Sequence, residues 1–106
     1  MTTSLELHVI FGAGQVGSLL AQALLSRGLA VRLVRRSAQQ SSHPLLQVYS
    51  ADAYDPAQAK AAAAGAAVVY QCTNAPYHQW PTHLSRLVLN IADAAQAAGA
   101  RLVVLD

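Results

Sequence analysis

Three glycines near the N-terminus have the spacing G-x-G-x-x-G, in the segment GAGQVG at residues 12–17. In that spacing Gly12 would allow a sharp turn, Gly14 would let the backbone approach a pyrophosphate, and Gly17 would let a helix pack closely on a strand. Backbone N–H groups at the start of that helix would meet the negative phosphates. The residues expected around the pyrophosphate are Gly12, Ala13, Gly14, Gln15, Val16 and Gly17.

Because glycine is common in turns, only the surrounding residues can distinguish a phosphate-binding turn from one that binds nothing. Residues 5–11 alternate and then become fully apolar, which predicts a strand. Apolar residues recur every three or four positions over residues 16–27, which predicts an amphipathic helix that Gly28 ends. A second apolar run of strand length follows at residues 29–34. The glycines therefore join a strand to a helix in a βαβ unit, which favours the phosphate-binding interpretation.

Strands and helices continue to alternate along the rest of the chain. Residues 35–44 are polar, contain Pro44 and lack an apolar stripe, so they predict a loop without a crossover helix. The remaining elements are expected to be strands at 45–52, 66–72 and 101–106 and helices at 56–65 and 82–98. Apolar strands separated by helices predict the α/β class, with a Rossmann-type, doubly wound parallel sheet of five strands in the order 3-2-1-4-5.

The end of the second predicted strand carries Arg35, Arg36 and Ser37, and no acidic residue occurs between Glu6 and Asp52. Folds that bind NAD place an Asp or Glu at this strand end, where it contacts the ribose hydroxyls. Guanidinium groups instead bind a 2'-phosphate through charge-assisted, bidentate hydrogen bonds. The sequence therefore favours NADP over NAD. The alternative for Arg35 and Arg36 is that they are a solvated pair of loop charges. Arg32 lies inside the strand and is expected to be structural.

Polar residues also follow the third and fourth predicted strands. Asp52 could accept a hydrogen bond from the adenine amino group or cap the helix that begins near Pro56, and Asp55 is the better candidate for the cap. Residues after the fourth strand, at the carboxyl edge of the sheet, would form a wall of the cofactor site: Thr73, Asn74 and Ala75. No metal site is expected, since His78 and His83 are five residues apart with a proline between them.

The composition limits the class of protein. The 106 residues are 54% hydrophobic and 11% charged, with a net charge of +2, which predicts one domain spanning residues 1–106. Neither a membrane-length apolar run nor a basic signal-peptide start is present, and Cys72 is the single cysteine, so we expect a cytoplasmic location and no membrane partner. The clustered arginines lack interleaved aromatic residues, which argues against a nucleic-acid partner.

The whole chain resembles the extended and atypical short-chain dehydrogenases/reductases, the NAD(P)-dependent epimerase/dehydratase group. The resemblance rests on GAGQVG, the helix-free loop after VRLVRRS, the segment SAD, and the stretches VVYQCTNAPYHQW and NIADAAQAAGARLVVLD. It implies that the three glycines hold the pyrophosphate and that Arg35, Arg36 and Ser37 hold the 2'-phosphate. It further implies that Asp52 contacts the adenine and that residues 73–75 form the wall of the cofactor site.

One departure from that family concerns the catalytic residues. The family uses a Ser or Thr and a Tyr-x-x-x-Lys pair beyond the fifth strand. The only lysine here is Lys60, and no tyrosine stands four residues before it. We therefore assign no catalytic residue and expect this chain to be the N-terminal, cofactor-binding part of a longer polypeptide, without turnover of its own.

Three functions remain open at the level of sequence. The favoured one is the NADP-binding domain of an oxidoreductase or epimerase/dehydratase that acts on a sugar-nucleotide or small carbonyl substrate. A non-catalytic module that senses NADP is the alternative. A ligand-gated regulatory domain of ion transporters is disfavoured, because that class usually keeps the acidic residue missing here. Self-association through the exposed edge of the last strand is also expected.

Overall fold

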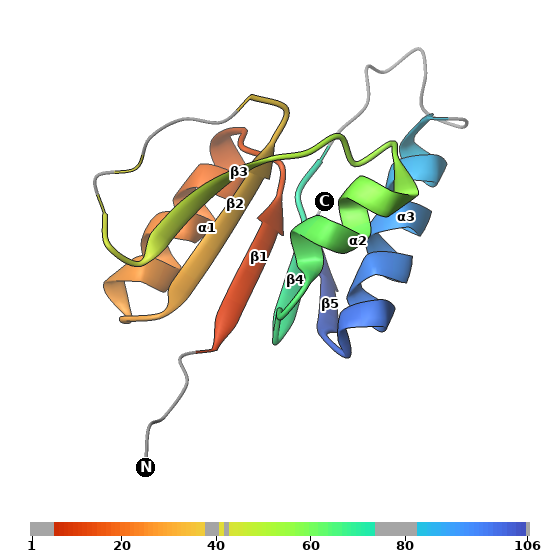
Figure 1. Cartoon of the computed structure of the whole chain (residues 1–106). Coiled ribbons are helices and arrows are strands. Elements are labelled where there is room, and N and C mark those ends of the chain that lie inside the picture. The colour runs from red at the N-terminus through yellow and green to blue at the C-terminus, as the bar shows by residue number, and fades with distance from the viewer. Residues whose placement is uncertain (1–5, 38–40, 42, 74–82, 106) are drawn as a thin grey trace.

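The computed structural model describes residues 6–37, 41, 43–73 and 83–105. They form five strands and three helices, which follow one another as β1 (Leu7–Phe11), α1 (Gln15–Ser26), β2 (Ala30–Arg35), β3 (Leu46–Ser50), α2 (Pro56–Ala63), β4 (Val68–Gln71), α3 (His83–Ala98) and β5 (Arg101–Val104). All strand pairs are parallel, and their order across the sheet is β3-β2-β1-β4-β5 (Figure 1). The predicted α/β class and strand order are confirmed.

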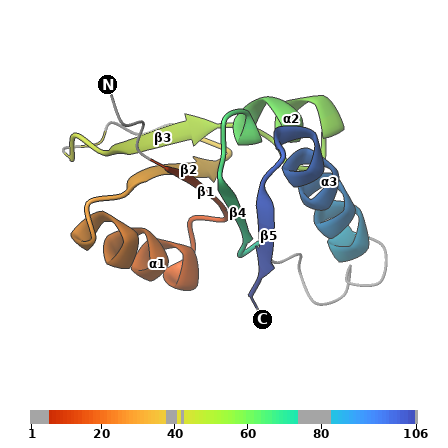
Figure 2. The same ribbon diagram turned by 90° about the horizontal axis from the view of Figure 1, so that it is seen from below.

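The helices cover the sheet from both sides. Viewed along the layers, α1 lies on one face, and α2 and α3 lie together on the other (Figure 2). The chain passes from β1 through α1 to β2 in one direction and returns from β3 through α2 to β4 on the far side of β1. The connection that leaves β1 and the connection that enters β4 therefore run on opposite sides, which makes the position between β1 and β4 a topological switch point. A doubly wound sheet binds its ligand outside the carboxyl ends of the strands at such a point.

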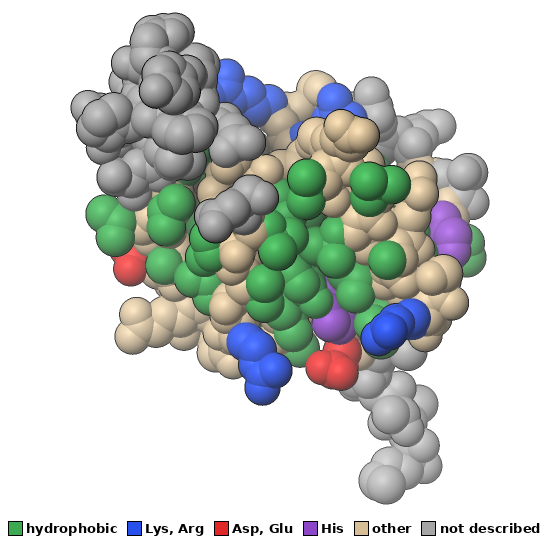
Figure 3. Space-filling model, turned by 180° about the vertical axis from the view of Figure 1, so that it is seen from behind, with side chains coloured by type: hydrophobic (Ala, Val, Ile, Leu, Met, Phe, Trp, Pro, Cys, Tyr) green, Lys and Arg blue, Asp and Glu red, His purple; other side chains and the backbone are tan. Residues whose placement is uncertain are grey.

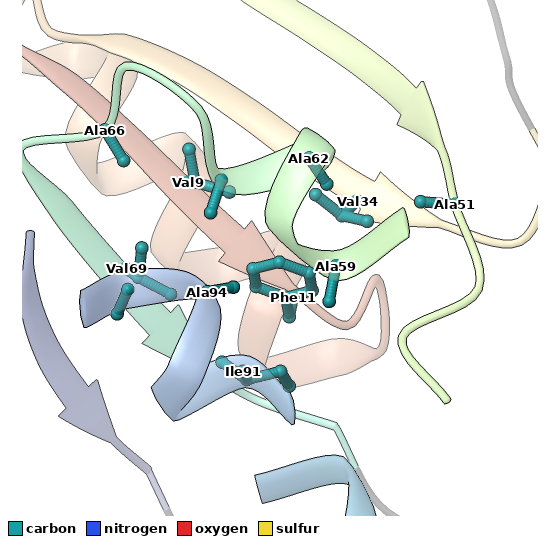
Figure 4. Close-up of a cluster of buried hydrophobic side chains, with 12 residues drawn as sticks. Val9, Phe11, Val34, Ala51, Ala59, Ala62, Ala66, Val69, Ile91 and Ala94 are labelled. Carbon is teal, nitrogen blue, oxygen red and sulfur yellow. The ribbon is translucent and has the colours of Figure 1, made fainter. Parts of the chain in front are cut away.

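The larger part of the core lies between the sheet and the pair α2 and α3 (Figure 4). Val9, Phe11 and Val69 project from the sheet toward Ile91 of α3, and all four are fully buried. The short helix α2 contributes small side chains, namely Ala59, Ala62 and Ala63. Because these methyl groups occupy little depth, α2 can approach both the sheet and α3 closely. A second cluster, around Ile10, faces α1.

The start of α2 identifies which aspartate caps it. Asp55 is the N-cap, and its Oδ1 accepts hydrogen bonds from the backbone N–H groups of Ala57 at 2.9 Å and Gln58 at 3.4 Å. Pro56 follows at the first helical position, where its missing N–H costs no hydrogen bond. The capping role considered for Asp52 is therefore wrong, because Asp55 occupies the position from which a side chain reaches these donors.

Arg32 has a structural role, as the sequence indicated. Its Nη1 donates to the carbonyl oxygens of Ala62 at 2.7 Å and Ala64 at 3.0 Å, at the end of α2. Its Nε donates to Oε1 of Gln47 at 2.9 Å, and its guanidinium lies 5.5 Å from the centre of the Tyr49 ring. A cation at the C-terminus of a helix binds otherwise unpaired carbonyls and opposes the helix dipole. Arg32 therefore joins β2 to α2.

The face of the sheet that carries α1 is apolar beyond the helix. Alternation along the strands places Val68 and Tyr70 of β4, and Val103 of β5, on this face. From this side, hydrophobic side chains gather in one continuous area (Figure 3). No helix in the described part of the chain is long and apolar enough to cross a membrane.

Candidate functional site

A cleft of about 740 Å³ opens at the carboxyl ends of the strands. Its lining comes from the ends of four strands and from α3, and consists of Phe11, Gly12, Ala13, Val34, Arg35, Arg36, Ala51, Asp52, Ala53, Tyr54, Thr73, Arg86 and Leu87. Six predicted site residues are among them: Gly12, Ala13, Arg35, Arg36, Asp52 and Thr73. The fold thus brings together residues that lie far apart in the sequence.

The three glycines of the first turn have different surroundings. Gly12 has a φ of +110°, and a Cβ there would lie 2.8 Å from the backbone carbonyl carbon and oxygen of Cys72. A Cβ on Gly17 would collide with the carbonyl oxygen of Gly12 and would lie 3.5 Å from Cγ2 of Ile10. A Cβ on Gly14 would meet no atom within 4 Å. The fold therefore requires glycine at positions 12 and 17, whereas Gly14 borders open space.

The N-terminus of α1 presents backbone donors. Gly14 is the N-cap and offers no side chain to accept their hydrogen bonds, and the first turn contains no acidic residue. Gln15 and Val16 are exposed in this turn, outside the lining of the cleft. The hydroxyl of Ser18 donates to the carbonyl of Ala13 at 3.1 Å, which holds the turn against the helix. Such a terminus attracts an anion through its N–H groups and its dipole.

The end of β2 supplies the positive charge of the cleft. Arg35 is partly buried, while Arg36 and Ser37 are exposed. The Arg36 guanidinium lies 5.7 Å from the centre of the Tyr54 ring, within the range of a cation–π contact. Ser37 follows directly but does not line the cleft. With Arg86 on α3, three arginines and one carboxylate line the described cleft, which favours an anionic ligand.

The segment after β3, residues 52–54, is held from two helices. Oδ1 of Asp52 accepts a hydrogen bond from the Tyr54 N–H at 3.0 Å, and the Asp52 N–H donates to Oε1 of Gln58 on α2 at 2.8 Å. From α3, Nδ2 of Asn90 donates to the carbonyl oxygens of Ala53 and Tyr54, both at 3.0 Å. We call residues 52–54 the Asp52 loop. Its conformation is fixed before any ligand binds.

The end of β4 forms another wall of the cleft. Gln71 is only 3% exposed, and its Nε2 donates to the carbonyl oxygen of Thr73 at 3.0 Å and to its Oγ1 at 2.7 Å. These bonds hold Thr73 at the rim. Asn74 and Ala75, also predicted for this wall, lie outside the described residues, as does His78. Burial raises the pKa of the neighbouring Cys72 thiol above its ordinary value, which disfavours a nucleophilic thiolate.

Sequence reasoning missed several residues at or behind the site, among them Tyr54, Arg86, Leu87 and Asn90. Leu87, Asn90 and Ile91 follow one another at helical spacing, so Asn90 is a polar residue within an apolar stripe and could have been found. Arg86 has no such signal, because exposed arginines are common on helices. Among the residues that the structure describes, no group of three or more His, Cys, Asp or Glu side chains could hold a metal ion.

Comparisons with known proteins agree with this geometry. The family model described as NAD(P)H-binding matches residues 12–105. Uronate dehydrogenase from Agrobacterium tumefaciens superimposes with a TM-score of 0.79 at 22% identity, over 95% of this chain and 40% of that one. A variant of the same enzyme complexed with NAD gives 0.79 at 22% identity, over 97% and 41%. A candidate epimerase from Bacteroides thetaiotaomicron gives 0.75 at 27% identity, over 95% and 47%.

The chain thus spans less than half the length of these solved structures. At 22% identity, the similarity to uronate dehydrogenase concerns the fold alone. None of the curated proteins compared with the chain matches it. The family model covers the stretches on which the expected resemblance rested, from the glycine turn that begins at Gly12 to Leu105 near the end of the last stretch. The chain therefore belongs to the NAD(P)H-binding family and has the fold of the cofactor-binding part of extended short-chain dehydrogenases/reductases.

Proposed function

We propose that this chain is the NADP-binding domain of an oxidoreductase or epimerase/dehydratase. The observation that carries the proposal is the position of Arg35 and Arg36 in the cleft, at the strand end where an acidic residue would contact the ribose of NAD. Two guanidinium groups here attract a 2'-phosphate, and no carboxylate at this strand end would repel it. A solved structure of similar fold is complexed with NAD, which makes NAD the competing cofactor to be tested.

We assign each part of the cofactor to residues in the cleft or beside it. The N–H groups at the start of α1, over residues 13–16, would bind the pyrophosphate, and the open space at Gly14 lets it approach. Arg35, Arg36 and Ser37 would bind the 2'-phosphate. The Asp52 carboxylate would accept a hydrogen bond from the adenine amino group. Residues 73–75 would border the path from the adenosine toward the nicotinamide, which supplies the hydride when the cofactor is bound.

The substrate class is proposed from resemblance, as a sugar nucleotide or a small carbonyl compound. The uronate dehydrogenase and the candidate epimerase have the same fold, and the chain spans only part of each. We propose that the proton-transferring tyrosine and lysine of the family are supplied from outside residues 1–106. No described contact favours the sensing module, so we propose no second function.

A fluorescence titration with NADPH and NADH tests the cofactor. One charge-assisted contact to a phosphate contributes roughly 1.5 to 3 kcal/mol, so NADPH should bind at least about tenfold more tightly. Competition by 2',5'-ADP, compared with 5'-ADP, separates the phosphate contact from contacts to the nicotinamide. Equal affinities for NADPH and NADH would contradict the proposed specificity, and the absence of binding by either would contradict the proposed function.

A further inference from the structure

We infer that Asn90 of α3 is a positioning residue for adenine recognition: it fixes the Asp52 loop so that the cleft distinguishes adenine from other purines. The inference rests on the proposed function and deepens it. Asn90 is absent from the lining of the cleft, so it acts on the ligand only through the loop.

The geometry at Asn90 leaves little freedom. An amide NH₂ group has two donor hydrogens, and Nδ2 of Asn90 contacts two acceptors at 3.0 Å, the carbonyl oxygens of Ala53 and Tyr54. The residue is only 8% exposed, so water has little access to replace these bonds. An apolar side chain of similar size would leave both carbonyls without this donor. Each of these two peptide groups would then be held only through its N–H, since Tyr54 donates to Oδ1 of Asp52 and Asp55 donates to the Asp52 carbonyl oxygen.

The two carbonyls are linked directly to the Asp52 carboxylate. The Tyr54 N–H donates to Oδ1 of Asp52, which orients the carboxylate and leaves Oδ2 to accept from an amino group in the cleft. On the other side, Gln58 accepts from the Asp52 N–H and donates through Nε2 to Oδ2 of Asp55 at 3.2 Å. Gln58 therefore fixes the start of the loop, and Asn90 fixes its end.

Tyr54, at the end of the Asp52 loop, carries the aromatic ring that Arg36 contacts. The Tyr54 ring lies 5.7 Å from the Arg36 guanidinium, and both residues line the cleft. A change at Asn90 would thus disturb the carboxylate and one aromatic wall together. It would leave the glycine turn in place, because that turn packs on Cys72 and Ile10.

The experiment compares NADPH with its deamino analogue, in which hypoxanthine replaces adenine. The analogue carries a carbonyl oxygen where adenine has an amino group, and that oxygen would face the Asp52 carboxylate. The wild-type chain should bind NADPH about tenfold more tightly than the analogue, and Asn90→Leu should reduce this ratio to within about twofold. Ile91→Val is the matched control, because it trims a buried neighbour on α3 and leaves the Asn90 hydrogen bonds to the loop in place, so it should lower the Tm but keep the ratio.

A second measurement follows the loop directly. Amide hydrogen exchange at Tyr54 should become faster in Asn90→Leu, relative to exchange at Val69 in the sheet. If Asn90→Leu does not fold, Asn90→Ser, which keeps one donor, should give an intermediate ratio. An unchanged ratio in whichever variant folds would overturn the inference about Asn90. Equal binding of NADPH and its deamino analogue by the wild type would overturn it too. Neither result would contradict the proposed binding of NADP. A wild-type chain that binds neither would instead overturn the proposed function.

Discussion

The carbonyl oxygen of Gly12 occupies the space that a Cβ on Gly17 would need. The two glycines, five positions apart, are therefore in direct backbone contact, and the first turn of α1 lies against the end of β1. Gly14, between them, borders nothing within 4 Å. The same glycine motif thus contains two residues that the fold requires and one whose surroundings are left open for a ligand.

Substitutions at these glycines should separate stability from binding. Gly17→Ala places a methyl group against backbone, which costs typically about 1 to 3 kcal/mol or more, so the Tm should fall clearly. Gly14→Val should leave the Tm nearly unchanged, since φ is −72° there and the space is open, but should abolish NADPH binding. Thermal unfolding and fluorescence titration measure the two effects. Unfolding of Gly14→Val, or tight NADPH binding by it, would show that the turn is only structural.

The double change Arg35→Ala and Arg36→Ala should remove the preference for NADPH. Loss of the contacts to the 2'-phosphate should weaken NADPH binding about tenfold or more, while NADH binding should change little. The matched control is Arg27→Ala, which removes an exposed arginine at the end of α1, away from the cleft. Equal weakening of both cofactors in the double variant would assign the two arginines to the fold.

The cap of α2 should contribute to stability and not to the choice between NADPH and NADH. Asp55→Ala removes the acceptor for two backbone N–H groups and should lower the free energy of unfolding by about 1 kcal/mol. Urea unfolding followed by circular dichroism measures this change. The ratio of NADPH to NADH affinity should stay at the wild-type value, because Asp55 does not line the cleft. A variant that loses the preference for NADPH would place Asp55 in the cofactor site.

Stability should decline at alkaline pH through Cys72 and Tyr70. Burial raises the pKa of the Cys72 thiol, and burial, with the negative charges of Glu6 and Cys72, raises the pKa of the Tyr70 hydroxyl. A raised pKa means that the folded state holds its proton more tightly. That stabilisation is complete below the unfolded-state pKa and is lost as the pH rises through the folded-state pKa. The loss should therefore begin above the ordinary thiol pKa of 9.0.

The variant Cys72→Ala isolates the thiol. Between about pH 7.5 and about pH 10, its urea midpoint should fall less than that of the wild type, because one of the two titrating groups is gone. Tyr70→Phe should also reduce the fall, mainly at the upper end of this range. Identical pH profiles for all three chains would exclude both groups as the cause.

The edge strand β5 should support self-association, which stays a prediction. Among the described residues, β5 pairs with a strand only on its β4 side, and Val104 on it is 50% exposed. Light scattering should show species larger than a monomer, and Val104→Lys should shift them toward the monomer, because a charge blocks pairing at an edge. Leu89→Lys on α3, where the leucine is 63% exposed, is the control and should change nothing. A monomeric wild-type chain would refute the prediction.

Most of the fold could be predicted because local signals agreed with one another. Gly28 and Gly99 each follow a helix and adopt positive φ, as a helix-ending glycine does. Strand order followed from parallel strands and right-handed crossovers. Strand ends were predicted too long, since β1 begins at Leu7 and β5 ends at Val104. Residues beyond the strand ends still bond to a neighbouring strand, as Leu105 does to the carbonyl oxygen of Gln71 at 3.0 Å, so hydrophobicity alone does not define where a strand ends.

The site was harder to predict than the fold because its residues depend on packing between distant elements. Arg35 and Arg36 could be recognised, since a strand end has a known place in this architecture. Tyr54 lines the cleft from a loop whose carbonyl is held by Asn90, 36 positions later. Arg86 lines the cleft because α3 packs beside α2, a contact between surfaces that no local pattern encodes. Residues that position others leave little trace in sequence spacing.

The attachment of Arg32 to the end of α2 restricts how this protein can vary by insertion or deletion. Side chains alternate along β2, so removing or adding one residue in the strand would put Leu33 or Val31 where the guanidinium now meets two carbonyls. The same slip would move Arg35 and Arg36 away from the cleft. None of the described residues between Ser37 and β3 contacts the end of α2 through these bonds or lines the cleft. Changes of length should therefore accumulate between β2 and β3, where they leave the register of the sheet and the position of the two arginines unchanged.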